Sequence, residues 1–170
     1  MQQANQQFSP GDPRSCSIAG ALDALGDTWS ILVLRELFFG VRRFSEMLTD
    51  LGISRSVLTD RLARLVELGV VRTEPYQEPG ERVRNQYRLT RKGVRLLPVM
   101  VGLMEWGDEF VNTGHPPVSL QERETGEEVR VELRTTSGRR VEPNQLVPVR
   151  RRSTTRTSRV GHAGRARQSA

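Results

Sequence analysis

Apolar side chains recur at helical spacing in five stretches of the chain, and glycine or small polar residues separate these stretches. The spacing predicts helices over residues 18–25, 28–39, 44–51, 54–68 and 91–111. Gly26, Gly40, Gly52 and Gly69 each follow a predicted helix, as expected of residues that end helices. This part of the chain therefore predicts a small, mainly helical domain.

The second and fourth predicted helices indicate where the core lies. In TWSILVLRELFF, residues 28–39, apolar side chains occupy more than one face, so this helix should be central, with Arg35 and Glu36 facing outward. Asp27 or Thr28 is expected to cap its start. On the fourth helix one buried stripe is formed by Leu58, Leu62 and Leu65.

Two strand patterns follow the fourth helix. VVRTEPY and NQYRLT are rich in β-branched and aromatic residues, and QEPGERVR between them carries Pro79 and Gly80 at its tip. They predict a β-hairpin with an arginine-bearing loop. A minor strand is also expected in VRRF, just before the third helix.

The C-terminal part of the chain changes character. VRVEL alternates strictly, VSL and LVPV are shorter strand candidates, and ETGEE and TSGRR look like turns, so residues 113–149 predict a small β appendage. Residues 1–15 and 150–170 lack apolar content and should be a mobile arm and a disordered arginine-rich tail. The fold class is α+β, mainly α, with its folded domain over residues 16–112.

The net charge of +6 is set by the tail, because residues 150–170 hold seven arginines and no acid, and the rest of the chain carries −1. The tail either attracts phosphates nonspecifically or is a passive solubilising end. Residues 40–95, with 12 Lys or Arg and 7 Asp or Glu, have a local surplus of +5. Positive charge is thus concentrated where a nucleic-acid surface would need it.

Composition excludes several functional classes. No long uncharged apolar run and no hydrophobic N-terminal stretch occur, so we expect a cytoplasmic protein without a membrane partner. The single cysteine, Cys16, allows no intrachain disulfide, and with only His115 and His162 beside it we expect no zinc site and no cofactor. No phosphate-binding glycine loop is present, and Cys16 has no base partner in sequence, so we expect no enzyme.

The order of elements predicts a winged helix-turn-helix. The third and fourth helices with the break between them form the helix-turn-helix, and the hairpin with its basic loop forms the wing. A helix fits the major groove of DNA, where each base pair shows a distinct hydrogen-bonding pattern. We therefore expect a regulator that binds double-stranded DNA, while a winged helix used for protein or RNA contacts is the alternative.

The candidate DNA-binding residues come from three segments. Groove contacts are expected at the start of the fourth helix and phosphate contacts along it. Arginines before the third helix and in the wing would contact the DNA phosphate backbone. The set is Arg42, Arg43, Ser54, Arg55, Ser56, Thr59, Arg61, Arg64, Arg82 and Arg84. For any single arginine, a solvated position or a pair with Glu46 or Asp50 is an equally good interpretation.

Several motifs resemble the HxlR-type winged helix regulators of bacteria in order and spacing: CSIAGALDALGDTW, ILVLREL, FFGVRRFSEM, GISRSVLTDRLARLVELGVV and YRLTRKGVRLLPVMVGLMEWGD. The resemblance implies a homodimer formed through the first and last helices, an inverted-repeat operator and, often, repression. The expected dimer residues are Ile18, Leu22, Leu97, Met100, Leu103, Met104 and Trp106. A methionine-rich apolar surface there could also admit a small-molecule effector.

Cys16 has two interpretations. Similar regulators that sense electrophiles or oxidants use a cysteine just before the first helix, and a thiol at a helix start near Arg14 should have its thiolate form favoured. Alternatively, Cys16 is a small hydrophobe that fills space at the dimer interface, which we prefer. In some of these regulators the appendage turns carry cysteine pairs, but ETGEE and TSGRR have no thiol, so the resemblance implies no zinc here.

Overall fold

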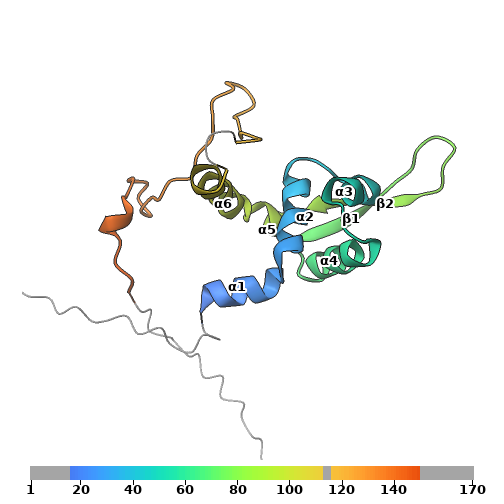
Figure 1. Cartoon of the computed structure of the whole chain (residues 1–170), viewed down its shortest axis with the longest axis horizontal. Coiled ribbons are helices and arrows are strands. Elements are labelled where there is room, and N and C mark those ends of the chain that lie inside the picture. The colour runs from blue at the N-terminus through green and yellow to red at the C-terminus, as the bar shows by residue number, and fades with distance from the viewer. Residues whose placement is uncertain (1–15, 113–115, 150–170) are drawn as a thin grey trace, which may run out of the picture.

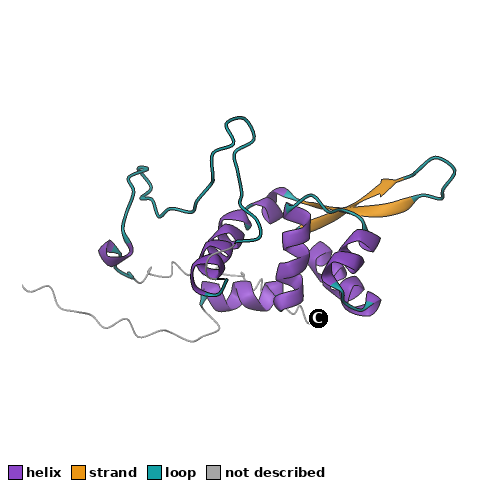
Figure 2. Ribbon diagram, turned by 45° about the horizontal axis from the view of Figure 1, so that its top comes forward, coloured by secondary structure: helices purple, strands orange, loops and turns teal. Residues whose placement is uncertain are grey.

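The computed structural model describes residues 16–112 and 116–149, so the expectations for residues 1–15 and 150–170 lie outside the described residues. The helices are α1 (Ser17–Leu25), α2 (Thr28–Phe38), α3 (Phe44–Leu51), α4 (Arg55–Glu67), α5 (Arg91–Val94) and α6 (Leu97–Phe110). The strands are β1 (Val71–Tyr76) and β2 (Arg84–Leu89). Helix α2 lies in the middle, with α3, α4 and the hairpin on one side and α1 and α6 on the other (Figures 1 and 2).

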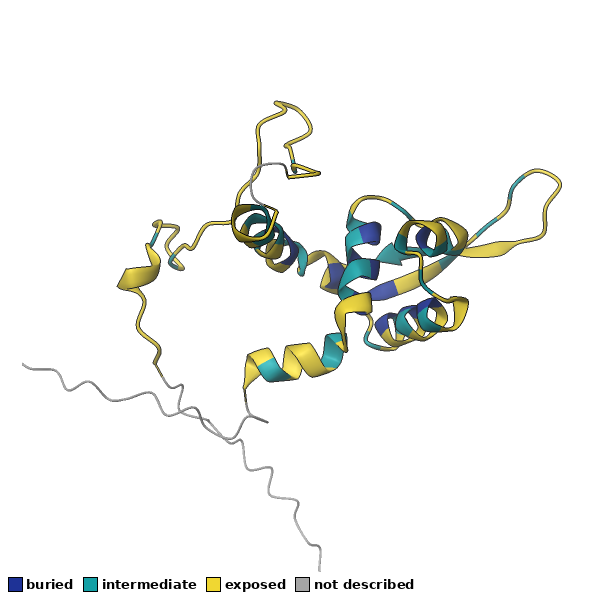
Figure 3. Cartoon of the chain, in the orientation of Figure 1, coloured by how far each residue is buried: buried dark blue, intermediate teal, exposed yellow. Residues whose placement is uncertain are grey.

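The core is built where the apolar pattern predicts it. Val33 and Leu34 of α2 are fully buried, which confirms that α2 is the central helix. The predicted stripe of α4 is confirmed as well, since the exposed fractions of its three leucines, Leu58, Leu62 and Leu65, are 0%, 1% and 0%. Buried positions gather where α2, α3, α4 and the hairpin meet (Figure 3).

Helices α2 and α4 each begin directly after a residue whose side chain caps the helix N-terminus. The Asp27 carboxylate accepts a hydrogen bond from the Ser30 amide at 3.1 Å and begins α2. The Ser54 hydroxyl accepts from the Val57 amide at 3.3 Å and begins α4. Between α3 and α4, Gly52 has φ 61°, a left-handed conformation that residues with a Cβ adopt only at a cost. These caps set the length of the turn that joins the two helices.

The expectation that Glu36 faces outward is wrong. Glu36 is only 5% exposed, and its carboxylate is ion-paired with the adjacent Arg35. Glu36 lines a groove of about 540 Å³ together with Met100 and Met104 of α6, so α6 covers this side of α2. Arg35, whose side chain is 37% exposed, compensates the charge that α6 shields from water.

The last predicted helix is interrupted. Residues 91–111 were expected to form one helix, but α5 ends at Val94 and α6 begins at Leu97. Pro98 stands in the first turn of α6, where its missing N–H leaves no hydrogen bond unmade. The break therefore lies just before the proline, and it redirects the chain from the hairpin to α6.

The predicted strands of the appendage do not form. Within residues 116–149 the chain makes two isolated antiparallel bridges, Gln121 with Glu128 and Arg134 with Arg140. Both predicted turns are present, with Gly126 at φ 72° and Gly138 at φ 88°. A lone two-stranded hairpin is only marginally stable, so the alternation in VRVEL is not enough to build a sheet. The backbone amides of Thr125 and Glu124 donate to the Glu122 carboxylate in the first of these turns. These hydrogen bonds lower the pKa of Glu122.

In the described part of the chain, no single helix has the length and hydropathy needed to cross a membrane. The bent pair α1 and α2, whose axes differ by 79°, meets the test by length and composition only.

Candidate nucleic-acid interface

Helix α4 presents a polar face to solvent on the side opposite its leucine stripe. Ser56, Thr59, Asp60 and Ala63 are all exposed on this face. Figure 3 shows exposed positions along the outer side of α4, with its buried positions turned toward α2. The side chains on this face are short, which allows a groove of DNA to approach the helix backbone closely.

The first turn of α4 carries several exposed donor and acceptor groups. The Ser54 and Ser56 hydroxyls lie 3.0 Å apart, within hydrogen-bonding distance. The Thr59 hydroxyl donates to the Arg55 carbonyl at 2.8 Å. The Arg55 guanidinium lies over an aromatic ring, with its central carbon 5.3 Å from the Phe44 ring centroid. Arg55 is thus held at the junction of α3 and α4 while it stays exposed.

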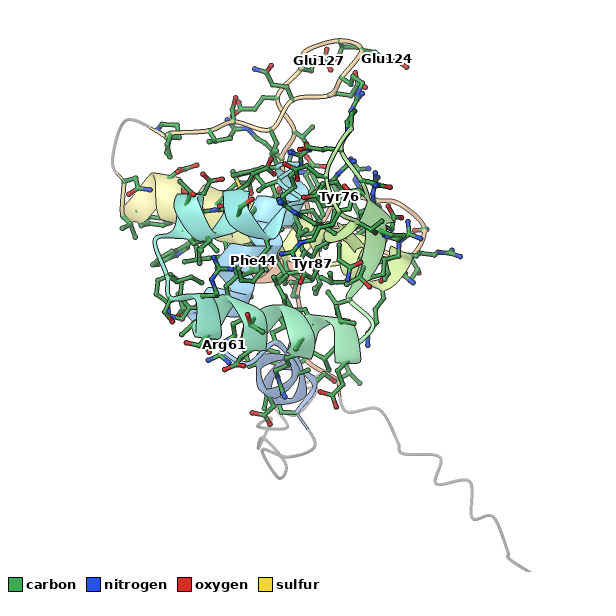
Figure 4. The ribbon with its side chains drawn as sticks, turned by 90° about the vertical axis from the view of Figure 1, so that its right-hand side faces the viewer. Phe44, Arg61, Tyr76, Tyr87, Glu124 and Glu127 are labelled. Atoms are coloured by element: carbon green, nitrogen blue, oxygen red, sulfur yellow. The ribbon has the colours of Figure 1, made fainter. Side chains whose placement is uncertain are left out.

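Arg61 and Arg64 do not face this surface. The Arg61 guanidinium forms an ion pair with Asp27 at 2.6 Å, at the start of α2. Arg64 donates to the carbonyls of Ala24 at 3.2 Å and Asp23 at 2.6 Å, at the end of α1. Figure 4 shows Arg61 on the side of α4 nearest α1. The charged groups of both arginines are thus engaged within the chain, on the side of α4 nearest α1.

The wing is an antiparallel hairpin whose register pairs Val71 with Leu89 and Tyr76 with Arg84. Arg82 is exposed in its loop, and no ion pair of Arg82 occurs within residues 16–112 and 116–149. Arg84, placed in the loop by the sequence pattern, is the first residue of β2 and pairs with Glu81 at 3.0 Å.

The two arginines before α3 differ in their surroundings. Arg42 is exposed, and its carbonyl accepts from the Tyr87 amide at 2.9 Å, so the predicted minor strand contacts β2. An isolated bridge between Arg43 and Gln86 confirms this strand pairing. The Arg43 side chain instead turns toward the wing, where it pairs with Glu78 at 2.6 Å.

Tyr87 joins the hairpin to the helical core. It is half-buried against the core cluster, and burial raises the pKa of its phenol. Phe44 of α3 packs against the same core cluster, and Figure 4 labels Phe44, Tyr87 and Tyr76, the last of which lies on the hairpin. The helical spacing of the sequence predicts that Phe44 faces inward, as found, but it assigns no role to the side chains of Tyr76 and Tyr87.

The expected dimer residues divide between surface and core. Ile18, Leu22, Leu103 and Trp106 are 72%, 62%, 53% and 59% exposed, which is high for apolar side chains. Leu97 and Met104 are half-buried, whereas Met100 is only 7% exposed. The exposed members lie on α1 and α6, away from α3, α4 and the hairpin (Figure 1).

Nothing in the described residues offers a metal site, since no group of three or more His, Cys, Asp or Glu side chains comes together there. Cys16 is exposed and stands at the start of α1. Its carbonyl accepts from the Gly20 amide at 2.9 Å, while its side chain makes no capping hydrogen bond.

The architecture and the polar face of α4 define a winged helix-turn-helix protein of the kind that binds DNA and regulates transcription. Residues 24–115 match the family model described as HxlR-like helix-turn-helix, so the chain belongs to this family.

Its relatives and structural neighbours agree with this assignment. The uncharacterized HTH-type transcriptional regulator MT3179 of Mycobacterium tuberculosis is 45% identical over 112 residues, which are 65% of this chain and 70% of that protein. The crystal structure of PA1607, described as a candidate transcription factor, matches with a TM-score of 0.70 and 34% identity over 81% of this chain and 96% of that one. PA1374 of Pseudomonas aeruginosa, described in the same way, matches with a TM-score of 0.57 and 33% identity over 83% and 96%.

Proposed function

We propose that this regulator binds an inverted-repeat operator as a homodimer and represses transcription from it. The observation that carries the proposal is the exposed, polar first half of α4, with Arg55 held over Phe44 beside it. In this arrangement α4 enters the major groove, Ser56 and Thr59 face base edges, and the helix N-terminus favours nearby phosphate.

The hairpin extends this surface beyond α4. Arg82 would contact phosphates or the flanking minor groove, and Arg84 beside Glu81 would add a second, weaker contact. Arg42, exposed before α3, would contact the DNA backbone on the other side of α4. Repression follows if the occupied operator overlaps a promoter, because a bound dimer then excludes polymerase.

Two copies are needed for an inverted repeat. The exposed apolar side chains of α1 and α6 supply a surface that a second copy would cover, with Leu22, Leu103 and Trp106 as its main contacts. Recognition helices of such dimers contact half-sites about 34–36 Å apart, one turn of DNA. The groove between α2 and α6 would be partly enclosed by this contact and is our candidate for an effector site.

The proposal is tested by footprinting the full chain on DNA upstream of its own gene. We expect two protected half-sites of inverted sequence, roughly 10 base pairs apart from centre to centre. A scrambled duplex of the same length and base composition is the control. Equal affinity for both duplexes, or protection of one half-site by a monomer, would contradict the proposal.

A charge on the α1 surface should separate the two copies. Leu22→Glu is expected to weaken dimerisation at least about 30-fold, because it places an unpaired carboxylate in an apolar contact. Sedimentation velocity without DNA measures the change. Val83→Glu, an equally drastic change at a 60% exposed position of the wing, is the matched control and should leave the dimer intact. Equal dimerisation of Leu22→Glu and the wild type would place the interface elsewhere.

We further propose that Cys16 is a dimer contact rather than an electrophile sensor. It is the chain's one cysteine, so an oxidative switch would need a link between two copies or an adduct with a small thiol. Treatment with diamide should leave operator affinity unchanged in the wild type, and Cys16→Ser should behave alike. Loss of affinity in the treated wild type, with Cys16→Ser resistant, would instead establish Cys16 as a sensor.

A further inference from the structure

The side chain of Arg43 lies where α3 meets the wing, and it contacts both. Its guanidinium pairs with Glu78 of the wing loop at 2.6 Å and lies 5.1 Å from the ring centroid of Tyr76, the last residue of β1. On the α3 side, Arg43 Nε is 3.8 Å from Glu46 Oε1, and the Arg43 amide donates to Glu46 Oε2 at 3.2 Å. One cation is therefore held between two carboxylates and above an aromatic ring.

The backbone already fixes the base of the hairpin near this point. Gln86 forms a bridge with Arg43, and the Tyr87 amide donates to the Arg42 carbonyl at 2.9 Å. The pair with Glu78 adds a second attachment further along, at the start of the loop. Two attachments along its length orient a hairpin, whereas one attachment lets it swing about its base.

The wing loop needs this arginine for a second reason. Glu78 and Glu81 are acidic residues in a loop that is expected to approach phosphates. Arg84 pairs with Glu81 at 3.0 Å, and Arg43 pairs with Glu78 at 2.6 Å. Without Arg43, the carboxylate of Glu78 would repel DNA from the wing. The side chains of Arg43 and Glu78 are 42% and 41% exposed, and exposed ion pairs contribute little to stability, so a role in folding does not explain the contact.

We infer that Arg43 is a positioning residue, which fixes the wing relative to α4 through Glu78 and Tyr76 and does not itself contact phosphate. This inference rests on the proposed DNA binding and replaces the sequence-based expectation that Arg43 grips the DNA backbone. Arg42, its exposed neighbour, keeps that expected role, since no ion pair of Arg42 is found where the structure describes the chain.

The dependence of operator affinity on salt separates the two roles in the full-length protein. Loss of one phosphate contact lowers the slope of log affinity against log salt by about 0.9, whereas loss of a positioning residue leaves it unchanged. We expect Arg43→Ala to bind about two- to fivefold more weakly with the wild-type slope. Arg42→Ala is the matched control and should show the reduced slope. A reduced slope in Arg43→Ala would overturn the inference.

A double-mutant cycle that combines Arg43→Ala with Glu78→Gln, read as operator affinity, gives a second and independent test. In the wild type this change releases Arg43 and should weaken binding, but in Arg43→Ala it removes an uncompensated carboxylate and should strengthen binding. If Arg43 were a phosphate contact, Glu78→Gln would strengthen binding in both backgrounds, which would overturn the inference.

Hydrogen exchange of the hairpin amides without DNA separates this inference from the proposed function. Arg43→Ala and Glu78→Gln should both speed exchange near the wing loop, and Arg42→Ala should not. Arg43→Lys should restore part of the protection, because it keeps a cation near Glu78 but loses the planar group over Tyr76. If exchange in Arg43→Ala is unchanged, the positioning role is overturned even when operator binding is confirmed. If exchange in Arg43→Ala is faster but the protein does not bind an operator, only the proposed function is overturned.

Discussion

Thr59→Glu is expected to abolish the preference for the operator and to lower specific affinity by roughly 100-fold. Thr59 is exposed on the polar face of α4, one turn beyond Arg55. A carboxylate there would face phosphates and base acceptors, while the favourable contacts of the hydroxyl are lost. Together these effects cost about 3 kcal/mol, and each 1.4 kcal/mol is about tenfold in affinity. Fluorescence anisotropy with operator and scrambled duplexes measures both quantities.

Two controls separate this effect from damage to the helix. The Thr59 hydroxyl makes an internal hydrogen bond to the Arg55 carbonyl, so Thr59→Val removes that bond without adding charge and should weaken binding far less. Thr136→Glu adds the same charge at an exposed position of the appendage and should leave affinity near the wild-type value. Retained operator preference in a folded Thr59→Glu would show that α4 is not the recognition helix.

The helix-turn-helix could be predicted from sequence because its signals are local. The stripe of Leu58, Leu62 and Leu65 repeats at helical spacing, and Ser54 and Gly52 mark the ends of neighbouring helices. The structure confirms each of these assignments. Each depends on residues within a few positions of one another, so no knowledge of the tertiary fold is needed.

The roles of individual arginines could not be predicted in the same way. Arg64 meets carbonyls 40 and 41 residues away at the end of α1, and Arg61 meets Asp27. From sequence alone, all exposed arginines of a basic segment look equally suited to phosphate. What distinguishes them is the position of α1 and the wing loop, which depends on tertiary packing. Glu36 was misplaced for the same reason, because α6 covers the side of α2 on which it lies.

In the appendage, the local sequence pattern predicts strands that the structure does not contain. Its alternating residues favour strands locally, but a strand persists only when it has a partner and a hydrophobic face to cover. Val129 and Val131 line a cavity with Val101 and Met104 of α6, but Val129, Val131 and Leu133 remain 44%, 38% and 45% exposed, so this alternating face is only partly covered. The two glycine turns form regardless, since their conformations are set by the residues of the turn itself.

Gly93→Ala should destabilise the fold by about 3 kcal/mol, although helix propensity alone predicts a gain of about 1 kcal/mol. Gly93 lies in α5, where a Cβ would stand 2.3 Å from the Val70 carbonyl oxygen and 3.1 Å from Leu89 Cδ2. The backbone cannot retreat easily, because that carbonyl accepts from the Thr90 amide at 3.0 Å. The Thr90 hydroxyl also binds the Gly69 carbonyl at 2.7 Å and accepts from the Gly93 amide at 3.2 Å.

This close approach holds α5 against the point where α4 passes into β1, so its loss should loosen the connection from the wing to α6. Denaturant unfolding measures the free energy of Gly93→Ala against Gly20→Ala, the matched control. Gly20 is also helical, but an added Cβ there meets nothing within 4 Å, so the change should stabilise α1 by up to about 1 kcal/mol. If Gly93→Ala were equally stabilising, α5 would not pack against Val70 as described. The connection from the hairpin through α5 to α6 would then be wrong.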